Sequence, residues 1–146
     1  MSLLSLLPHK DAALLLTAAE LDEEQNLICS QVIRWDHPGL AGHFPEFPIW
    51  PGHLLIEAMA QSAALLHLLR RDRPLAANEN PVLGAVQCRL LKPVFPGDRL
   101  EFHTKLLRAI GDGALFSVEA RRDQAAVATA RITAGISQRG HLKPSE

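Results

Sequence analysis

The run from Gly52 to about Leu69 is apolar on every side if it forms a helix. A helix of this kind must be covered by other parts of the chain, whereas an amphipathic helix lies at a surface. The run also approaches the length of a membrane span, but it contains Glu57 and Gln61 among other polar residues. We therefore predict a central helix that the rest of a soluble domain wraps.

The segment before this helix, from Gly42 to Pro51, is rich in proline. Pro45, Pro48 and Pro51 each fix φ and lack a backbone N–H, so the segment cannot be regular helix or an interior strand. Pro51 suits the first helical position, where the missing N–H would have had no partner. A loop this stiff is expected to hold His43 in one place, which makes His43 a candidate functional residue.

Three groups in this region suit one kind of chemistry. A carboxylate such as Glu57 in an apolar helix must be paired, hydrogen-bonded or protonated, and a protonated one can act as a general acid. His43 can act as the base, because a neutral imidazole accepts a proton. Gly52 lets a ligand approach its N–H closely, at the positive end of the helix dipole. Together they predict removal of a proton α to a carbonyl with departure of a β-hydroxyl group.

The segment from Gly42 to Gln61 resembles the active-site motif of the β-hydroxyacyl-acyl carrier protein dehydratases of fatty acid synthesis. The family motif reads Gly-His-Phe-Pro, then Pro-x-x-Pro-Gly, then Glu-Ala-Met-Ala-Gln, and all three pieces are present. Leu7-Pro8-His9-Lys10 and the turn from Lys92 to Asp98 are also similar to the family. The resemblance implies the α+β hotdog fold, an antiparallel sheet around one long helix. It implies a single domain over residues 1–146, with a polar tail from about residue 138.

The resemblance also implies roles for particular residues. The family's catalytic histidine falls on His43, its catalytic glutamate on Glu57, and the backbone amide that polarises the thioester carbonyl on Gly52. Phe44, Pro51 and Gln61 are then expected to line the substrate pocket, with Gln61 as a hydrogen-bond partner that shapes the site. A glutamate at position 57 resembles the pure dehydratase branch more than the dehydratase-isomerase branch.

Partners follow from the same resemblance. The substrate would be an acyl chain on the phosphopantetheine of an acyl carrier protein, and no metal or redox cofactor is implied. In the family, histidine and glutamate meet across a dimer interface, which implies a homodimer, with a trimer of dimers as a further assembly. His53 and Glu57 stand four residues apart, near His43, and could suggest metal ligands, but no further ligand cluster accompanies them.

Some positions depart from the family pattern and leave alternatives open. Glu46 stands where a glycine is usual, His53 replaces a small or aliphatic residue, and the chain has no tyrosine. A hotdog acyl thioesterase, a non-catalytic acyl-thioester-binding protein and a dehydratase of a specialised polyketide or aryl-polyene pathway therefore remain possible. A thioesterase would need a water positioned by a carboxylate and would not require the His43 loop.

The overall composition excludes some partners. A net charge of −1 gives no reason to expect nucleic acid or an anionic membrane surface as a ligand. Cys29 and Cys88 are spaced neither for a metal site nor for a disulfide framework, which favours a reducing cytoplasm.

The remaining segments are separated by turn residues, which predicts strands. Alternation is clear in one of them, where Leu100, Phe102, Thr104 and Leu106 alternate with Glu101, His103 and Lys105 and predict one buried face. A hairpin is expected around the acidic turn Asp22–Asn26. The predicted strands are Leu14–Ala19, Leu27–Ile33, Val82–Leu91, Arg99–Ala109, Ala114–Arg122 and Ala125–Ser137. A sheet of these strands would have two edges, and edge pairing between subunits is an economical route to a dimer.

Overall fold

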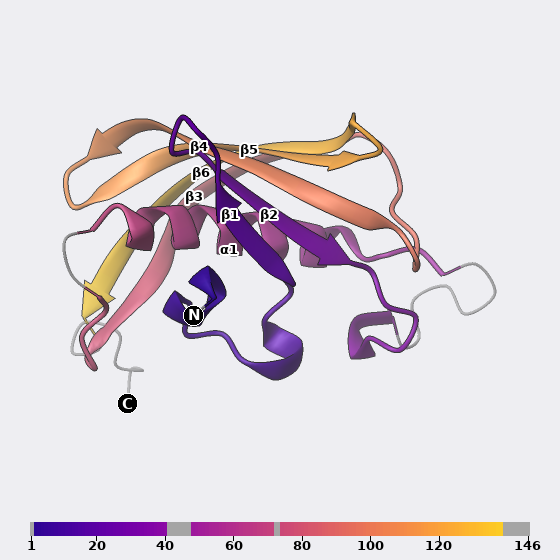
Figure 1. Ribbon diagram of the computed structural model, residues 1–146, viewed down its shortest axis with the longest axis horizontal. Coiled ribbons are helices and arrows are strands. Elements are labelled where there is room, and N and C mark those ends of the chain that lie inside the picture. Colours follow the sequence, from indigo (N-terminus) through magenta and orange to yellow (C-terminus); the bar gives the residue numbers. More distant parts are fainter. Residues whose placement is uncertain (1, 41–47, 72–73, 139–146) are drawn as a thin grey trace.

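The computed structural model describes residues 2–40, 48–71 and 74–138. A six-stranded sheet curls over one helix, α1 (Gly52–Leu69), as Figure 1 shows. The strands are β1 (Ala18–Leu21), β2 (Leu27–Val32), β3 (Glu79–Leu90), β4 (Arg99–Ile110), β5 (Gly113–Arg122) and β6 (Ala125–Gln138). Their order is β1-β2-β4-β5-β6-β3, and every neighbouring pair is antiparallel. The predicted architecture is confirmed.

Helix α1 is the core of the molecule and has the predicted bounds. Ala58, Met59, Ala63 and Leu65 are fully buried in it. The helix is long and apolar enough to cross a membrane, but most of it is covered by the fold, as expected for a core helix. Pro51 is the residue before the helix and not its first residue, so that detail of the prediction is wrong. The Pro51 carbonyl oxygen accepts the N–H groups of Leu54 and Leu55.

The inner face of the sheet supplies the other half of the core. Leu100, Phe102 and Thr104 alternate with more exposed residues along β4, as the sequence predicts. Phe116 lies on the neighbouring β5 and, like Phe102, is fully buried. Burial of one such side chain stabilises the fold by about 1.5–3 kcal/mol. Because successive side chains of a strand point to opposite faces of the sheet, the apolar positions of each strand determine which face meets the helix.

The N-terminal segment, residues 2–17, covers the side of α1 that the sheet leaves open (Figure 1). We call it the N-terminal strap. It contains two short 3-10 helices, Leu3–Leu6 and Asp11–Ala13, and it buries Leu15 and Leu16. The prediction of a strand from Leu14 is therefore wrong, because β1 begins only at Ala18. The N–H of Leu15 donates to the side chain of Gln61 on the helix and not to a neighbouring strand.

Strand β3 is one edge of the sheet and pairs with β6. It begins at Glu79, earlier than predicted, where a largely buried ion pair anchors it. The Glu79 carboxylate lies 3.1 Å from the Arg71 guanidinium just after α1, and it accepts the Ala76 N–H at 2.9 Å. Further along, β3 exposes Leu83, Val86 and Leu90. A long edge strand with exposed apolar side chains is a surface on which another chain can pair.

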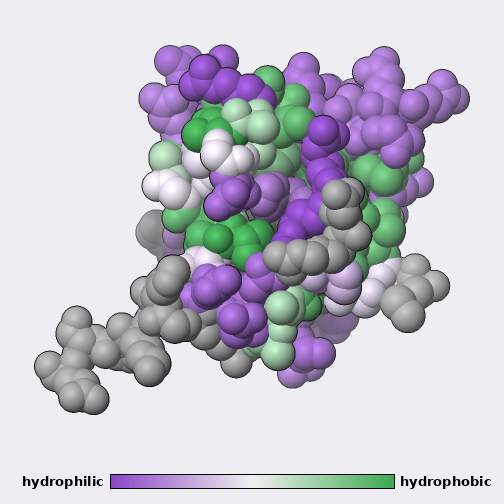
Figure 2. Space-filling view, turned by 90° about the vertical axis from the view of Figure 1, so that its left-hand side faces the viewer, coloured by the Kyte–Doolittle hydropathy of each residue, from purple (hydrophilic) through white to green (hydrophobic). Residues whose placement is uncertain are grey.

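At the end of the molecule where β3 begins and β6 ends, the surface is less uniformly apolar than the exposed row on β3. Figure 2 views this end and shows hydrophobic patches broken up by hydrophilic residues. The sequence predicts a polar tail from about residue 138, and β6 ends at Gln138. The remainder of that tail lies outside the described residues.

Candidate active site

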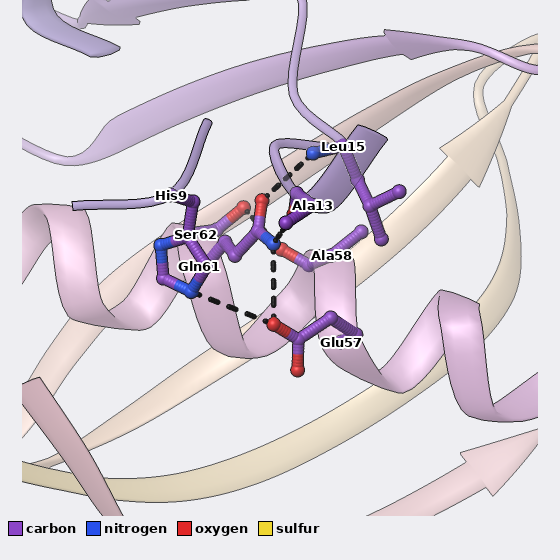
Figure 3. A network of polar contacts seen from close by, with 7 residues as sticks. All are labelled: His9, Ala13, Leu15, Glu57, Ala58, Gln61 and Ser62. Carbon is purple, nitrogen blue, oxygen red and sulfur yellow. Dashed lines mark hydrogen bonds and ion pairs between the residues drawn. The ribbon is translucent and has the colours of Figure 1, made fainter. Parts of the chain in front are cut away.

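Glu57 projects from α1 toward the N-terminal strap, and Figure 3 shows its surroundings. One turn further along the helix, Gln61 donates from Nε2 to Glu57 Oε1 at 3.2 Å. Residues four apart lie on the same helix face, so this contact is a direct result of the spacing. The Glu57 side chain is 44 % exposed in the single chain. The carboxyl is therefore only half-buried in one chain taken alone, and Gln61 is its hydrogen-bond partner.

Gln61 is the fixed point of this network, because it is almost fully buried. Its Oε1 accepts the Leu15 N–H at 3.0 Å, and its Nε2 donates to the Ala13 carbonyl oxygen at 2.6 Å as well as to Glu57. Only the carbonyl end of an amide can accept an N–H, so the Leu15 contact determines the orientation of this side chain. Gln61 thus fastens the strap to the helix and presents an N–H to Glu57.

His9, on the strap, is the second group beside the carboxyl. Its Nε2 lies 3.6 Å from Glu57 Oε1, and both side chains border the same cavity. The sequence interpretation assigned His9 no role. The signal that pointed to it was its place in Leu7-Pro8-His9-Lys10, the N-terminal piece of the family resemblance.

The cavity at Glu57 has a volume of about 190 Å³. Ala60 and Ala64 form its wall on α1, and Pro81, Val82 and Leu83 of β3 form another. The small alanine side chains leave room along the helix beyond the carboxyl. A small apolar group can therefore lie beside α1 next to Glu57.

Gly52 borders a different cavity, of about 250 Å³, together with Trp50 and Leu90. It is the first residue of α1, where backbone N–H groups have no partner within the helix. A Cβ on Gly52 would lie 2.7 Å from Leu90 Cδ1, so any side chain here would displace Leu90. The structure of one chain thus leaves Gly52 and Glu57 in separate cavities.

The remaining predicted site residues divide into two groups. His43, Phe44 and Glu46 lie outside the described residues. Pro51 is described and buried directly before α1, and His53 is exposed in its first turn. Among the described residues, no group of three or more His, Cys, Asp or Glu side chains is placed to hold a metal ion.

Comparison with solved structures identifies the fold. The dehydratase heterocomplex ApeI:P from Xenorhabdus doucetiae superposes with a TM-score of 0.79 at 20% identity, covering 97% of this chain and 95% of that chain. A thioesterase from Haemophilus influenzae superposes with a TM-score of 0.62 at 13% identity, covering 88% of this chain and 82% of that one. At such identities the likeness establishes the hotdog fold alone, and the predicted fold class is confirmed.

Comparison of sequences identifies the family. The model of the FabA-like domain matches residues 7–131. The 3-hydroxyacyl-[acyl-carrier-protein] dehydratase FabZ of Bartonella quintana is 38% identical over 135 residues, 92% of this chain and 86% of that protein. The enzyme of the same name from Rhizobium leguminosarum bv. trifolii is 37% identical over 135 residues, again 92% of this chain and 86% of that protein. The chain therefore belongs to the FabA-like family of 3-hydroxyacyl-[acyl-carrier-protein] dehydratases.

Proposed function

We propose that this chain dehydrates a (3R)-hydroxyacyl thioester, carried by an acyl carrier protein, to the trans-2-enoyl thioester in fatty acid or related acyl-chain synthesis. The observation that carries the proposal is Glu57, whose carboxyl is held by Gln61 at the mouth of an alanine-walled cavity. The names of the curated relatives support the same substrate and the hydro-lyase class.

In the proposed reaction, His43 takes the α-proton, whose acidity the thioester carbonyl raises. The Gly52 N–H stabilises the negative charge that develops on the carbonyl oxygen. Glu57, protonated, donates to the β-hydroxyl group as the C–O bond breaks, so that water leaves and the C=C bond forms. The reaction is redox-neutral, so it consumes no electron donor or acceptor. The role of His43 rests on the motif, since this residue lies outside the described part of the chain.

The places of the two cavities support a site built from two chains. Leu83 of β3 borders the Glu57 cavity, and Leu90 of the same strand borders the Gly52 cavity. Antiparallel pairing of β3 with β3 of a second copy would set the Glu57 cavity of one chain toward the Gly52 cavity of the other. We therefore include a homodimer in the proposal, in which each site takes its amide and its carboxyl from different chains. Assembly into a trimer of dimers stays a prediction.

The replacement Val86→Arg tests this dimer. Val86 is exposed on β3, and a charge placed there would be desolvated when two edges pair. We expect the variant to be monomeric by size-exclusion chromatography with light scattering, and to lose dehydration at the same protein concentration. The matched control is Leu21→Arg on β1, the opposite edge of the sheet, which is expected to stay dimeric. A dimeric and active Val86→Arg protein would contradict the proposed interface.

The reaction itself is tested by ultraviolet detection of the enoyl thioester formed from 3-hydroxyacyl-acyl carrier protein substrates of several chain lengths. We expect enoyl formation by the wild-type protein, no release of free thiol, and loss of turnover in His43→Ala. Thiol release would instead indicate a thioesterase. Binding of an unchanged substrate would indicate an acyl-thioester-binding protein. The chain-length profile separates general fatty acid synthesis from a specialised pathway.

A cytoplasmic location belongs to the same proposal. Cys29 and Cys88 are both free thiols. Burial raises the pKa of Cys29 to about 11, partly offset by its hydrogen bond with Ser62. A thiol of this kind stays protonated and unreactive at neutral pH, as suits a cysteine that fills the core and forms no disulfide.

A further inference from the structure

His9 reaches Glu57 from a different part of the chain. Its imidazole comes from the N-terminal strap and Glu57 from α1, and Figure 3 shows the ring turned with Nε2 toward the carboxyl. The strap is held in place independently of His9, because Gln61 binds the backbone of Ala13 and Leu15. The placement of His9 beside the carboxyl is therefore built into the fold.

The surroundings of the His9 ring favour one tautomer. Nδ1 is fully buried and has no hydrogen-bond partner, while Nε2 faces Glu57 Oε1 at 3.6 Å. A hydrogen on Nδ1 would be a buried N–H donor without a partner, which costs free energy. The geometry thus favours the tautomer with its hydrogen on Nε2, a donor directed at Glu57.

The two oxygens of Glu57 are placed differently. Oε1 faces two donors, Gln61 Nε2 at 3.2 Å and His9 Nε2 at 3.6 Å. Within the described residues, no hydrogen bond or ion pair holds Oε2. A proton on Oε1 would point at groups that are themselves donors, so the carboxyl proton belongs on Oε2.

We propose that His9 is a positioning residue, whose Nε2–H holds Glu57 Oε1 so that the proton on Oε2 is aimed at the leaving hydroxyl group. The proposal rests on the function proposed above, in which Glu57 is the acid. The 3.6 Å separation is longer than a hydrogen bond, and catalytic contacts of this kind commonly shorten when the substrate binds. Gln61 and His9 approach Oε1 from α1 and from the strap, so the two donors together hold this oxygen and leave Oε2 for the substrate.

Three substitutions of His9 separate a positioning role from a packing role. Gln can place its amide N–H near the former Nε2, Asn can fill only the region of Nδ1, and Leu has no donor. We expect Leu and Asn to lower kcat by about 10- to 100-fold with KM nearly unchanged, because a misplaced catalytic group costs up to about 100-fold. His9→Gln should recover most of kcat. Thermal unfolding of each variant shows whether the fold is retained.

A second readout does not depend on turnover. In protein labelled with ¹³C at the glutamate carboxyl carbons, the Glu57 resonance is identified by its absence from Glu57→Gln. We expect it to shift in His9→Leu and to stay near its wild-type position in His9→Gln. If the wild-type protein shows no dehydration, the proposed function fails, and this resonance alone decides the His9 contact.

Two results would overturn the inference. One is an unchanged kcat, or an unchanged Glu57 resonance, in a folded His9→Leu protein. The other is an equal loss of kcat in folded His9→Leu and His9→Gln, which would mean that the imidazole volume matters and its donor does not.

Discussion

Replacement of Glu57 by glutamine is expected to lower kcat for dehydration by about 10²- to 10⁴-fold, the usual contribution of a general acid. Glutamine has nearly the same volume, and its carbonyl oxygen can still accept the Gln61 N–H that now reaches Oε1. An amide has no acidic proton to give to the leaving hydroxyl group, so the loss should fall on kcat and leave KM little changed. Steady-state enoyl formation measures both constants.

The stability of Glu57→Gln should differ from that of the wild type by less than about 0.5 kcal/mol, because the side chain is half-exposed. The matched control is Glu20→Gln on β1, an exposed glutamate far from the cavity in the fold, which should keep wild-type kcat. Glu57→Gln with wild-type turnover would remove Glu57 from the mechanism and leave the cavity as a binding site only.

Replacement of Gln61 by leucine is expected to lower the free energy of unfolding by about 2–4 kcal/mol. The same replacement should also lower kcat for dehydration. Leucine fills a similar volume but leaves the Leu15 N–H and the Ala13 carbonyl oxygen without the partner that Gln61 now supplies. It also removes the donor that orients Glu57. Equilibrium urea unfolding at a fixed protein concentration measures the first effect, since the stability of an oligomer depends on concentration.

Two controls sharpen this result. Gln138→Leu changes the same side chain at an exposed position on β6 and should be nearly neutral. Gln61→Glu keeps an acceptor for the Leu15 N–H but sets a second carboxyl beside Glu57 and the Ala13 carbonyl oxygen. The Gln61→Glu protein should therefore have a lowered kcat, although its free energy of unfolding should fall less than that of Gln61→Leu. A Gln61→Leu protein as stable as the wild type would show that the strap is held by its apolar contacts alone.

The central helix and most of the sheet could be predicted from local patterns. An apolar run without a polar face has few ways to be buried, so Gly52–Leu69 was predicted with its observed bounds. The alternation in β4 likewise identified its buried face. The separation of Gly52 from Glu57 could also have been foreseen, because the two residues lie about 140° apart around an α-helix.

The N-terminal strap could not be predicted in this way. The residues around Leu15 have the length and apolarity of a strand, and nothing nearby in the sequence marks them as different. What decides their structure is the amide of Gln61, a residue distant in the sequence that takes the Leu15 N–H for itself. For the same reason His9 was missed, since its contact with Glu57 exists only once the strap lies on the helix.

The order of the strands has a consequence for synthesis on the ribosome. β3 is the first strand after α1, yet its neighbour in the sheet is β6, the last of the described strands in chain order. Until Ala125–Gln138 has emerged, the nascent chain carries an apolar helix that is only partly covered and a long strand with both edges unpaired. Exposed surfaces of this kind associate nonspecifically, and pairings distant in sequence form slowly. The chain is therefore most open to association with other chains in the interval before β6 has been synthesised.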